Sequence, residues 1–273
     1  MIDLRKGDCL DVMQTIESGS IDAIITDPPY GTTACKWDSV IPFEPMWDQL
    51  NRIIKTNGAI VLFGSEPFSS ALRMSNIKNY KYDWIWEKSM PTGMATASFM
   101  PMKYHEIISV FVNTGKPTFN KQMASRSQIG QQRLKNNGKI LNGNKSNGKH
   151  INKAKLKGTY SEYSKTKVNP KSILKIKSVP NCNGTKLHST QKPIALMEYL
   201  IKTYTNENET VLDFTMGSGS TGVACQNTNR NFIGIEKGSE HFNLVVRFGG
   251  CRGLFLPDSF NMAQLADRWL NAC

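Results

Sequence analysis

The sequence lacks the features that mark disulfide-rich, metal-binding and membrane-spanning proteins. Its six cysteines are scattered without a Cys-x-x-Cys pair, and its four histidines show no metal-ligand spacing with them. We therefore expect neither a disulfide framework nor a metal site. No apolar run approaches the roughly 20 residues that span a bilayer, and the first residues lack the apolar segment of a signal peptide. These absences predict a cytoplasmic protein without a membrane-bound part.

Acidic residues are also nearly absent from one quarter of the chain. Residues 115–180 hold sixteen Lys or Arg and a single acid, Glu162, so this segment carries +15 whereas the whole chain of 273 residues carries +12. The segment is rich in Asn, Gly and Ser and has no clear helical period. Such a basic segment forms a counter-surface for phosphates, which indicates DNA binding. A solvated loop without a partner is the alternative.

The most informative motif begins where a predicted strand ends. Residues Asp22–Thr26 favour a buried strand, and Asp27-Pro28-Pro29-Tyr30 follows directly. Because proline fixes φ and has no amide hydrogen, the strand must stop and the turn must be stiff. Asp27 is thus predicted at the carboxyl end of a strand, where open α/β sheets bind their ligands. A carboxylate beside a bare carbonyl can accept both hydrogens of one amino group, and Tyr30 offers a flat ring for stacking. A plain surface turn is the alternative.

A glycine-rich motif follows another apolar strand late in the chain. Thr210–Asp213 reads as that strand, and a helical stretch at Val223–Thr228 comes after the turn. The dinucleotide fingerprint G-x-G-x-x-G is matched by Gly217, Gly219 and Gly222. The next predicted strand, Asn231–Glu236, ends in an acid of the kind that accepts hydrogen bonds from ribose hydroxyls. The alternative is a plain glycine turn between a strand and a helix.

These motifs together resemble those of the S-adenosylmethionine-dependent amino-methyltransferases of DNA. The Asp27 tetrapeptide precedes the glycine-rich motif, with a basic segment between them, which resembles the order called the β class. The resemblance covers residues 1–114 and about 186–240. Three smaller matches support it: Gly7-Asp8-Cys9-Leu10, Phe63-Gly64-Ser65 and His188-Ser189-Thr190-Gln191-Lys192-Pro193.

The resemblance implies a role for each motif. Asp27 and the Pro28 carbonyl would bind the target amino group, and Tyr30 would stack on the extruded base. The implied catalytic residues are Asp27, Pro28, Pro29 and Tyr30. Glu236 would hold the ribose of the cofactor S-adenosylmethionine, Asp8 would reach its adenine, and Lys192 would contact it from a closing segment. The implied cofactor-binding residues are Asp8, Cys9, Asp27, Ser189, Lys192, Pro193, Asp213, Phe214, Gly217, Ser218, Gly219 and Glu236.

The same resemblance gives the organisation of the chain. It implies a discontinuous catalytic domain, residues 1–114 and 186–273, interrupted by a basic target-recognition insert at residues 115–185. Double-stranded DNA is the expected partner, and a cognate restriction endonuclease and a homodimer are left open. The residues expected to bind DNA are Lys116, Lys121, Arg126, Arg133, Lys135 and Lys139.

The expected fold is α/β: a doubly wound, mostly parallel, Rossmann-like methyltransferase sheet. Predicted helices cover Phe43–Thr56, Pro67–Met74 and Pro193–Tyr204, and further strands cover Ala59–Phe63, Tyr82–Trp86 and Glu106–Val112. Because the chain starts in the middle of the usual strand order, the late half must fold back beside the early half. Trp84 and Trp86 are expected in the core.

The expected reaction is methylation of adenine N6 in DNA. Family members that act on cytosine N4 more often carry serine at the Asp27 position, which favours adenine; cytosine N4 remains the alternative. The sequence has no Pro-Cys dipeptide of the cytosine-C5 type. A non-catalytic DNA-binding protein with the same fold is a further alternative, against which the intact acid, stacking ring and glycine turn argue.

Overall fold

The computed structural model describes residues 1–33, 38–129, 132, 167–179, 191–239 and 242. Within them the chain forms two compact units, residues 1–120 with 172–273 and residues 121–171. The domain boundaries at 114/115 and 185/186 that the resemblance implies stay a prediction. No helix of the described residues is long and apolar enough to cross a membrane.

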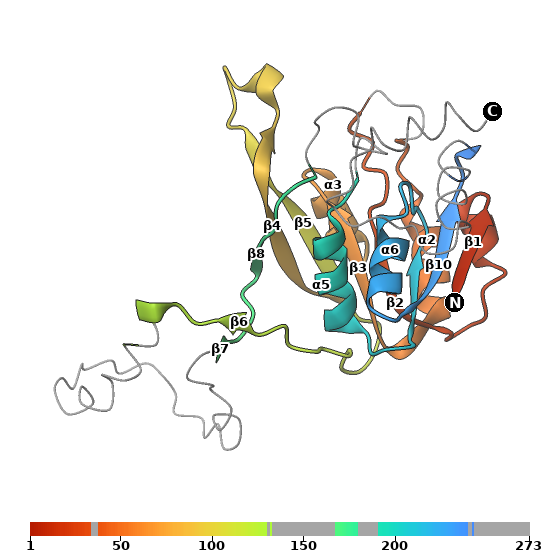
Figure 1. Cartoon of the computed structure of the whole chain (residues 1–273). Helices are drawn as coiled ribbons and strands as arrows, with labels where there is room; N and C mark the ends of the chain where they lie inside the picture. Colours follow the sequence, from red (N-terminus) through yellow and green to blue (C-terminus); the bar gives the residue numbers. More distant parts are fainter. Residues whose placement is uncertain (34–37, 130–131, 133–166, 180–190, 240–241, 243–273) are drawn as a thin grey trace, which may run out of the picture. The chain divides into compact units, whose positions relative to one another are not determined.

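The first unit is built on an eight-stranded sheet of mostly parallel strands with the order β1-β10-β9-β2-β3-β5-β4-β8 (Figure 1). Only β5 runs against its two neighbours, β3 and β4. The strands are β1 (Ile2–Lys6), β2 (Ile21–Thr26), β3 (Ile54–Gly64), β4 (Tyr80–Thr92), β5 (Lys103–Phe111), β8 (Ile173–Lys175), β9 (Thr210–Asp213) and β10 (Asn231–Glu236). The expected α/β, doubly wound and mostly parallel fold is thereby confirmed.

Two pairings join the ends of the chain. β1 pairs in parallel with β10, and β2 pairs in parallel with β9, with Ile24 opposite Leu212. The late half of the chain therefore folds back beside the early half, as expected, and the carboxyl ends of β1, β2, β9 and β10 meet at one edge of the sheet.

Helices cover both faces of this sheet because side chains alternate along each strand. Ala23 and Ile25 of β2 pack with α5 (Ile194–Tyr204) and α6 (Ser220–Asn227), whereas Ile24 packs with the helices on the other face. Those helices are α1 (Cys9–Met13), α2 (Phe43–Ile53) and α3 (Phe68–Ser75). Trp84 and Trp86 are buried in the core on the α5 face, as expected.

One predicted helix is too long. The stretch Phe43–Thr56 was expected to be helical throughout, but α2 ends at Ile53 and β3 begins at Ile54. Ile54 is extended, with φ −74° and ψ 139°, and pairs with Ile21 of β2. The apolar period alone cannot show this boundary, because Ile53 and Ile54 are both buried and fit either element.

The second unit contains the short strands β6 (Ala124–Ser125) and β7 (Lys167–Val168), which pair antiparallel. In the first unit, β4 and β5 form a long hairpin whose turn carries the 3-10 helix η1 (Met94–Thr96) (Figure 1).

Candidate active site and cofactor pocket

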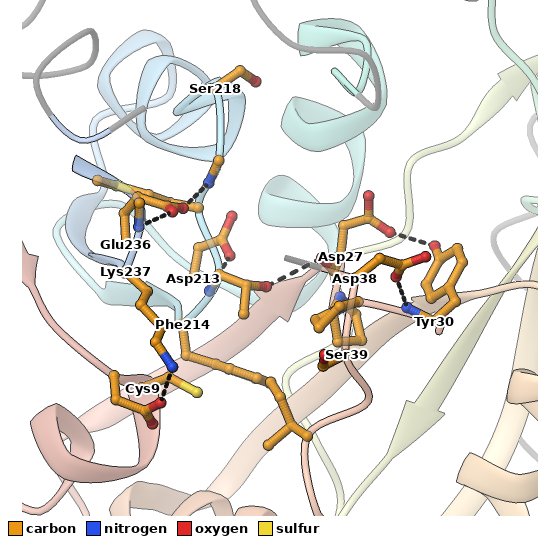
Figure 2. Close-up of a pocket in the computed structure, with 18 of the residues that line it drawn as sticks. Cys9, Asp27, Tyr30, Asp38, Ser39, Asp213, Phe214, Ser218, Glu236 and Lys237 are labelled. Carbon is orange, nitrogen blue, oxygen red and sulfur yellow. Dashed lines mark hydrogen bonds and ion pairs between the residues drawn. The ribbon is translucent and has the colours of Figure 1, made fainter. Parts of the chain in front are cut away.

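A cavity of about 780 Å³ lies at the carboxyl ends of four parallel strands. Residues that directly follow β1, β2, β9 and β10 line it, so each wall is a strand-to-helix turn or a strand end. Figure 2 shows Asp27 and Tyr30 at one side, Glu236 and Lys237 at the other, and Asp213 between them. This is the edge at which open α/β sheets bind nucleotide-like ligands, and the volume suits a small-molecule cofactor.

Asp27 is held by two side chains that come from different parts of the chain. The Tyr30 hydroxyl donates to one carboxylate oxygen, and the Lys192 ammonium donates to the other. The Asp27 side chain is 20% exposed. Burial raises the pKa of Asp27, and the Glu106 charge raises it further, while Lys192 and Tyr30 lower it. The carboxylate is therefore fixed in orientation but depends on its partners for its charge.

The loop that carries Tyr30 is anchored by Asp38. One Asp38 oxygen accepts the backbone amides of Tyr30 and Gly31 at 2.8 and 2.9 Å, and the other accepts those of Thr32 and Thr33 at 2.9 and 2.7 Å. Burial alone would raise the pKa of Asp38, but hydrogen bonds from the Thr33 side chain and from the Gly31, Thr33 and Thr32 amides outweigh burial and hold the pKa below its ordinary value. Four amides aimed at one carboxylate fix the turn that presents the Tyr30 ring.

A hydrogen-bonded cluster locks the two motifs together. Thr26, the last residue of β2, donates to Asp213 at 2.8 Å and accepts the Phe214 amide at 3.0 Å. Thr221 of α6 donates to the second Asp213 oxygen at 2.5 Å, and Thr215 donates its hydroxyl to the Asp27 carbonyl at 3.1 Å. Burial raises the pKa of Asp213 to about 6 although the threonine hydroxyls oppose the rise.

The three glycines of the fingerprint serve two different needs. Gly217 and Gly219 have φ of +49° and +75°, which only glycine adopts without strain. Gly222 is instead required for packing, since a Cβ there would meet the Phe232 ring at 2.9 Å. This is the close contact between helix and strand that the third glycine of such a turn allows.

The far wall of the cavity carries the carboxylates of Glu236 and Asp8 and the ammonium of Lys237. Glu236 accepts the amides of Gly217 at 3.0 Å and Gly238 at 2.7 Å, so its carboxylate spans the glycine turn. Asp8 caps α1 through the Leu10 amide at 3.0 Å and pairs with Lys237 at 3.0 Å. Beside it, burial raises the pKa of the Cys9 thiol to about 11, so this cysteine lines the cavity as a neutral group.

Most of the site residues predicted from the sequence come together in this cavity. Its lining includes Asp8, Cys9, Asp27, Pro28, Pro29, Tyr30, Lys192, Asp213, Phe214, Gly217, Ser218 and Glu236. Pro193 and Gly219 adjoin the lining but are not part of it, and Ser189 lies outside the described residues. The individual roles that the resemblance implies for these residues stay predictions.

The residues expected to bind DNA are distributed differently. Lys116 belongs to the first unit, away from the cavity lining, and Lys121 and Arg126 belong to the second. Arg133, Lys135 and Lys139 lie outside the described residues.

Three residues of the site were not singled out in the sequence. Thr26 and Asp38 are the hydrogen-bonding anchors described above, and Glu106 of β5 forms an ion pair with Lys192 at 3.3 Å. A threonine at a strand end gives a weak signal of its own, and the pairing of Glu106 with Lys192 depends on a contact across 86 positions of sequence.

A doubly wound sheet that carries an acid-Pro-Pro-aromatic turn beside a nucleotide-type glycine turn defines a Rossmann-like methyltransferase. The family model described as DNA methylase (N6_N4_Mtase) matches residues 21–247. The chain therefore belongs to this family, the S-adenosylmethionine-dependent amino-methyltransferases of DNA, and S-adenosylmethionine is its cofactor.

Individual relatives agree with this assignment. The Type II methyltransferase M1.MboII of Moraxella bovis is 29% identical over 257 residues, which cover 88% of this chain and 93% of the relative. The Type II methyltransferase M.HpaI of Haemophilus parainfluenzae is 27% identical, over 86% of this chain and 70% of its own length.

Solved structures show the same architecture. The crystal structure of the M1.HpyAVI–SAM complex matches with a TM-score of 0.59 and 26% identity, covering 90% of this chain and 99% of that one. The PvuII DNA methyltransferase, which is cytosine-N4-specific, matches with a TM-score of 0.63 at 15% identity, covering 99% and 92%, and so shares the fold.

The residues of the cavity fit the cofactor of the family. S-adenosylmethionine carries a sulfonium and an ammonium, and the carboxylates of Asp27, Asp213 and Glu236 line the cavity. The positive φ of Gly217 and Gly219 lets the turn leave its backbone open to a close ligand.

Proposed function

We propose that this DNA amino-methyltransferase acts on the exocyclic N6 of adenine in double-stranded DNA. The observation that carries the proposal is that the Asp27-Pro28-Pro29-Tyr30 turn and the glycine-rich turn at Gly217 line one cavity, although about 190 residues separate them in sequence. A methyl donor held by the second turn then lies within the same enclosure as an amino group held by the first.

The chemistry asked of Asp27 follows from the weakness of the nucleophile. The lone pair of an exocyclic amine is delocalised into the base, so the nitrogen attacks poorly while it is planar. Asp27 and the Pro28 carbonyl accept its two hydrogens and draw the nitrogen towards a tetrahedral shape, which frees the lone pair. The bound cofactor supplies the electrophilic methyl group. Positioning and preorganised dipoles provide most of the acceleration.

Tyr30 and the enclosure of the site imply that the base leaves the helix. A target amine inside a duplex is out of reach of a cavity, and methyltransferases as a class extrude the nucleotide. The Tyr30 ring packs against Phe68, with the ring centroids 5.1 Å apart, and its hydroxyl is tied to Asp27. A ring fixed in this way forms a rigid surface on which the extruded base stacks.

The preference for adenine rests on the carboxylate at position 27. Cytosine N4 is the competing target, because both bases present an amine beside a ring nitrogen. Digesting methylated DNA to nucleosides and identifying the product by mass spectrometry separates the two. N6-methyladenine supports the proposal, and N4-methylcytosine as the product overturns it.

The role of Asp27 is tested by Asp27→Ala. We expect this variant to lose methyl transfer while its affinity for S-adenosylmethionine, measured by calorimetry, stays within a few-fold of wild type. Asp48→Ala, at an exposed position of α2 outside the cavity, is the matched control and should retain full activity. Normal turnover by the Asp27 variant would contradict the role assigned here.

We further assign target recognition to the basic insert, residues 115–185. Its sixteen Lys and Arg between residues 115 and 180 suit the phosphates on either side of a recognition site. Replacing Lys121 and Arg126 by Gln should weaken DNA binding and flatten its dependence on salt. The relatives include Type II methyltransferases, and we propose on this basis that a cognate restriction endonuclease acts alongside this protein.

A further inference from the structure

Four charged side chains of alternating sign lead from the hairpin strands to the catalytic acid. Lys88 of β4 pairs with Glu106 of β5 at 3.3 Å, and Glu106 pairs with Lys192 at 3.3 Å. Lys192, just before α5, donates directly to Asp27. The side chains of Lys88, Glu106, Lys192 and Asp27 are 8, 17, 9 and 20% exposed. We call these four residues the charge chain.

Such a chain is expensive to bury, so its presence beside the catalytic acid needs a reason. Charges taken out of water lose much of their solvation, and ion pairing compensates for this loss only in part. Apolar residues of similar size would serve packing at least as well. A chain of buried ions that ends on a catalytic carboxylate therefore indicates a function beyond stability.

Lys192 is fixed on Asp27 from several sides. Its ammonium contacts the two carboxylates of Asp27 and Glu106 and lies 5.1 Å from the centroid of the Phe63 ring. Phe63 is fully buried in β3 and Glu106 stands on the neighbouring strand β5. Phe63 and Glu106 both belong to strands of the sheet, and together they hold the ammonium beside Asp27.

We propose that Lys192 is a positioning residue for methyl transfer, which keeps Asp27 ionised and oriented, and that Glu106, backed by Lys88, holds Lys192 in place. The inference rests on the proposed role of Asp27 as the acceptor of the target amino group. It assigns Lys192 to the acid, in contrast to the cofactor contact that the family resemblance implies.

The electrostatics agree with this assignment. Burial raises the pKa of Asp27, and a protonated Asp27 would lose an acceptor that the target amine needs. Lys192 lowers the pKa of Asp27, whereas Glu106 raises it. Although burial alone would lower it, the pKa of Lys192 is raised by its two carboxylate partners, so the ammonium stays charged. Among the described residues, the charged or titratable groups that act on Asp27 or on its partners Tyr30 and Glu106 are Asp38, Lys88 of β4, Lys103 of β5, Lys192 before α5 and Asp213 of β9.

The test is the pH profile of single-turnover methyl transfer to unmethylated genomic DNA, with the full-length chain in excess and saturating S-adenosylmethionine. The acid limb of this profile is the fall in rate at low pH. Lys192→Met should move it upwards by about one to three pH units, since an opposite charge within contact distance shifts the pKa of a carboxyl group by that amount. Lys192→Arg keeps the charge and should keep the limb near its wild-type position. Glu106→Gln removes the ion pair that holds Lys192 in place but leaves the charge of Lys192, so the limb should move upwards by less than in Lys192→Met.

Each outcome decides for or against the inference. An unmoved limb in Lys192→Met overturns the role of Lys192. A limb that is unmoved or lowered in Glu106→Gln overturns the role of Glu106, since the loss of its charge alone would lower the pKa of Asp27. If the limb of Lys192→Met does not move and its affinity for S-adenosylmethionine falls more than tenfold, Lys192 contacts the cofactor instead, as the family resemblance implies. The position of the limb is read from the shape of the profile, so a smaller folded fraction lowers the rate at every pH without moving the limb. Melting curves at each pH confirm that the folded fraction of the variant does not itself change across the limb.

Failure of this inference is distinguishable from failure of the proposed function. If the wild-type product is not N6-methyladenine, the proposed function is wrong whatever the limb does. If wild type forms N6-methyladenine and the limb of Lys192→Met does not move, only the positioning role is wrong.

Discussion

Replacing Asp213 by Asn should make this protein more stable at neutral pH. Asp213 is 4% exposed, and burial raises its pKa to about 6 from the ordinary 3.8. An Asn side chain has the same shape and carries no charge. Its oxygen can keep the hydrogen bonds from Thr26 and the Thr215 amide, and its amide can donate to the Thr221 hydroxyl, which turns to accept.

The magnitude follows from the linkage between protonation and folding. Because the pKa is higher in the folded state, the native protein binds more protons than the unfolded chain between about pH 4 and pH 6, and Asp213 destabilises it as the pH rises through that window. At about 1.4 kcal/mol for each pH unit of difference, the penalty above pH 6 is about 3 kcal/mol. The Asn variant escapes this penalty, so the two proteins should be equally stable near pH 4 and about 3 kcal/mol apart at pH 8.

Urea denaturation at a series of pH values measures this gap, and Asp38→Asn is the matched control. The pKa of Asp38 is lowered in the folded state, so this carboxylate contributes stability above its unfolded pKa that is lost as the pH falls through the folded value. Asp38→Asn should therefore destabilise the protein at pH 8. An Asp213→Asn variant that is no more stable than wild type at pH 8 would refute the reasoning, since the hydroxyl donors would then outweigh burial.

Two further substitutions test how the site is assembled. Thr26→Val should lower the free energy of unfolding by about 2 kcal/mol, because it leaves the buried Phe214 amide without its acceptor and removes one of the two hydrogen bonds to an Asp213 oxygen. Thr203→Val removes a hydroxyl that donates within α5 and should cost under about 1 kcal/mol in the same denaturation assay. A similar loss in both variants would contradict this account. Gly222→Ala should destabilise the protein by about 1–3 kcal/mol, because the added methyl group would press on the buried Phe232 ring. A denaturant titration measures this loss, and an unchanged midpoint would show that the ring moves aside.

The sequence was sufficient for the fold because its signals were local and agreed with one another. Pro28 and Pro29 end the strand predicted at Asp22–Thr26, and the glycine turn after Asp213 ends the apolar strand before it, so each of these strands has a local stop signal. The predicted helix end at Thr56 was wrong because Ile53 and Ile54 are both apolar and buried, and the pairing of Ile54 with Ile21 of β2 decides which element includes Ile54. Pairing between strands that lie far apart in sequence gives no signal in the local sequence.

The residues of the candidate site also fall into those that the local sequence predicts and those that depend on contacts between distant segments. Asp27 directly follows β2, and Asp213 and Glu236 are the last residues of β9 and β10, so their place at the sheet edge could be predicted from position alone. Glu106 could not, because its importance arises from an ion pair with Lys192 that forms only when β5 lies near the start of α5. Sequence motifs point to the residues that we propose to contact the substrate or the cofactor. The residues that we propose to position them, such as Glu106, are found only from contacts in the folded chain.

The bond between Thr26 and Asp213 links the fold to the chemistry. Thr26 immediately precedes Asp27, and Asp213 opens the glycine-rich turn, so a hydrogen bond of 2.8 Å links the two motifs. Neither motif can reach this position unless β2 and β9 pair, and that pairing joins segments almost 190 residues apart. The strand pairing that completes the sheet therefore also completes the cavity. A chain in which the late half had not yet folded back would hold both motifs and no active site.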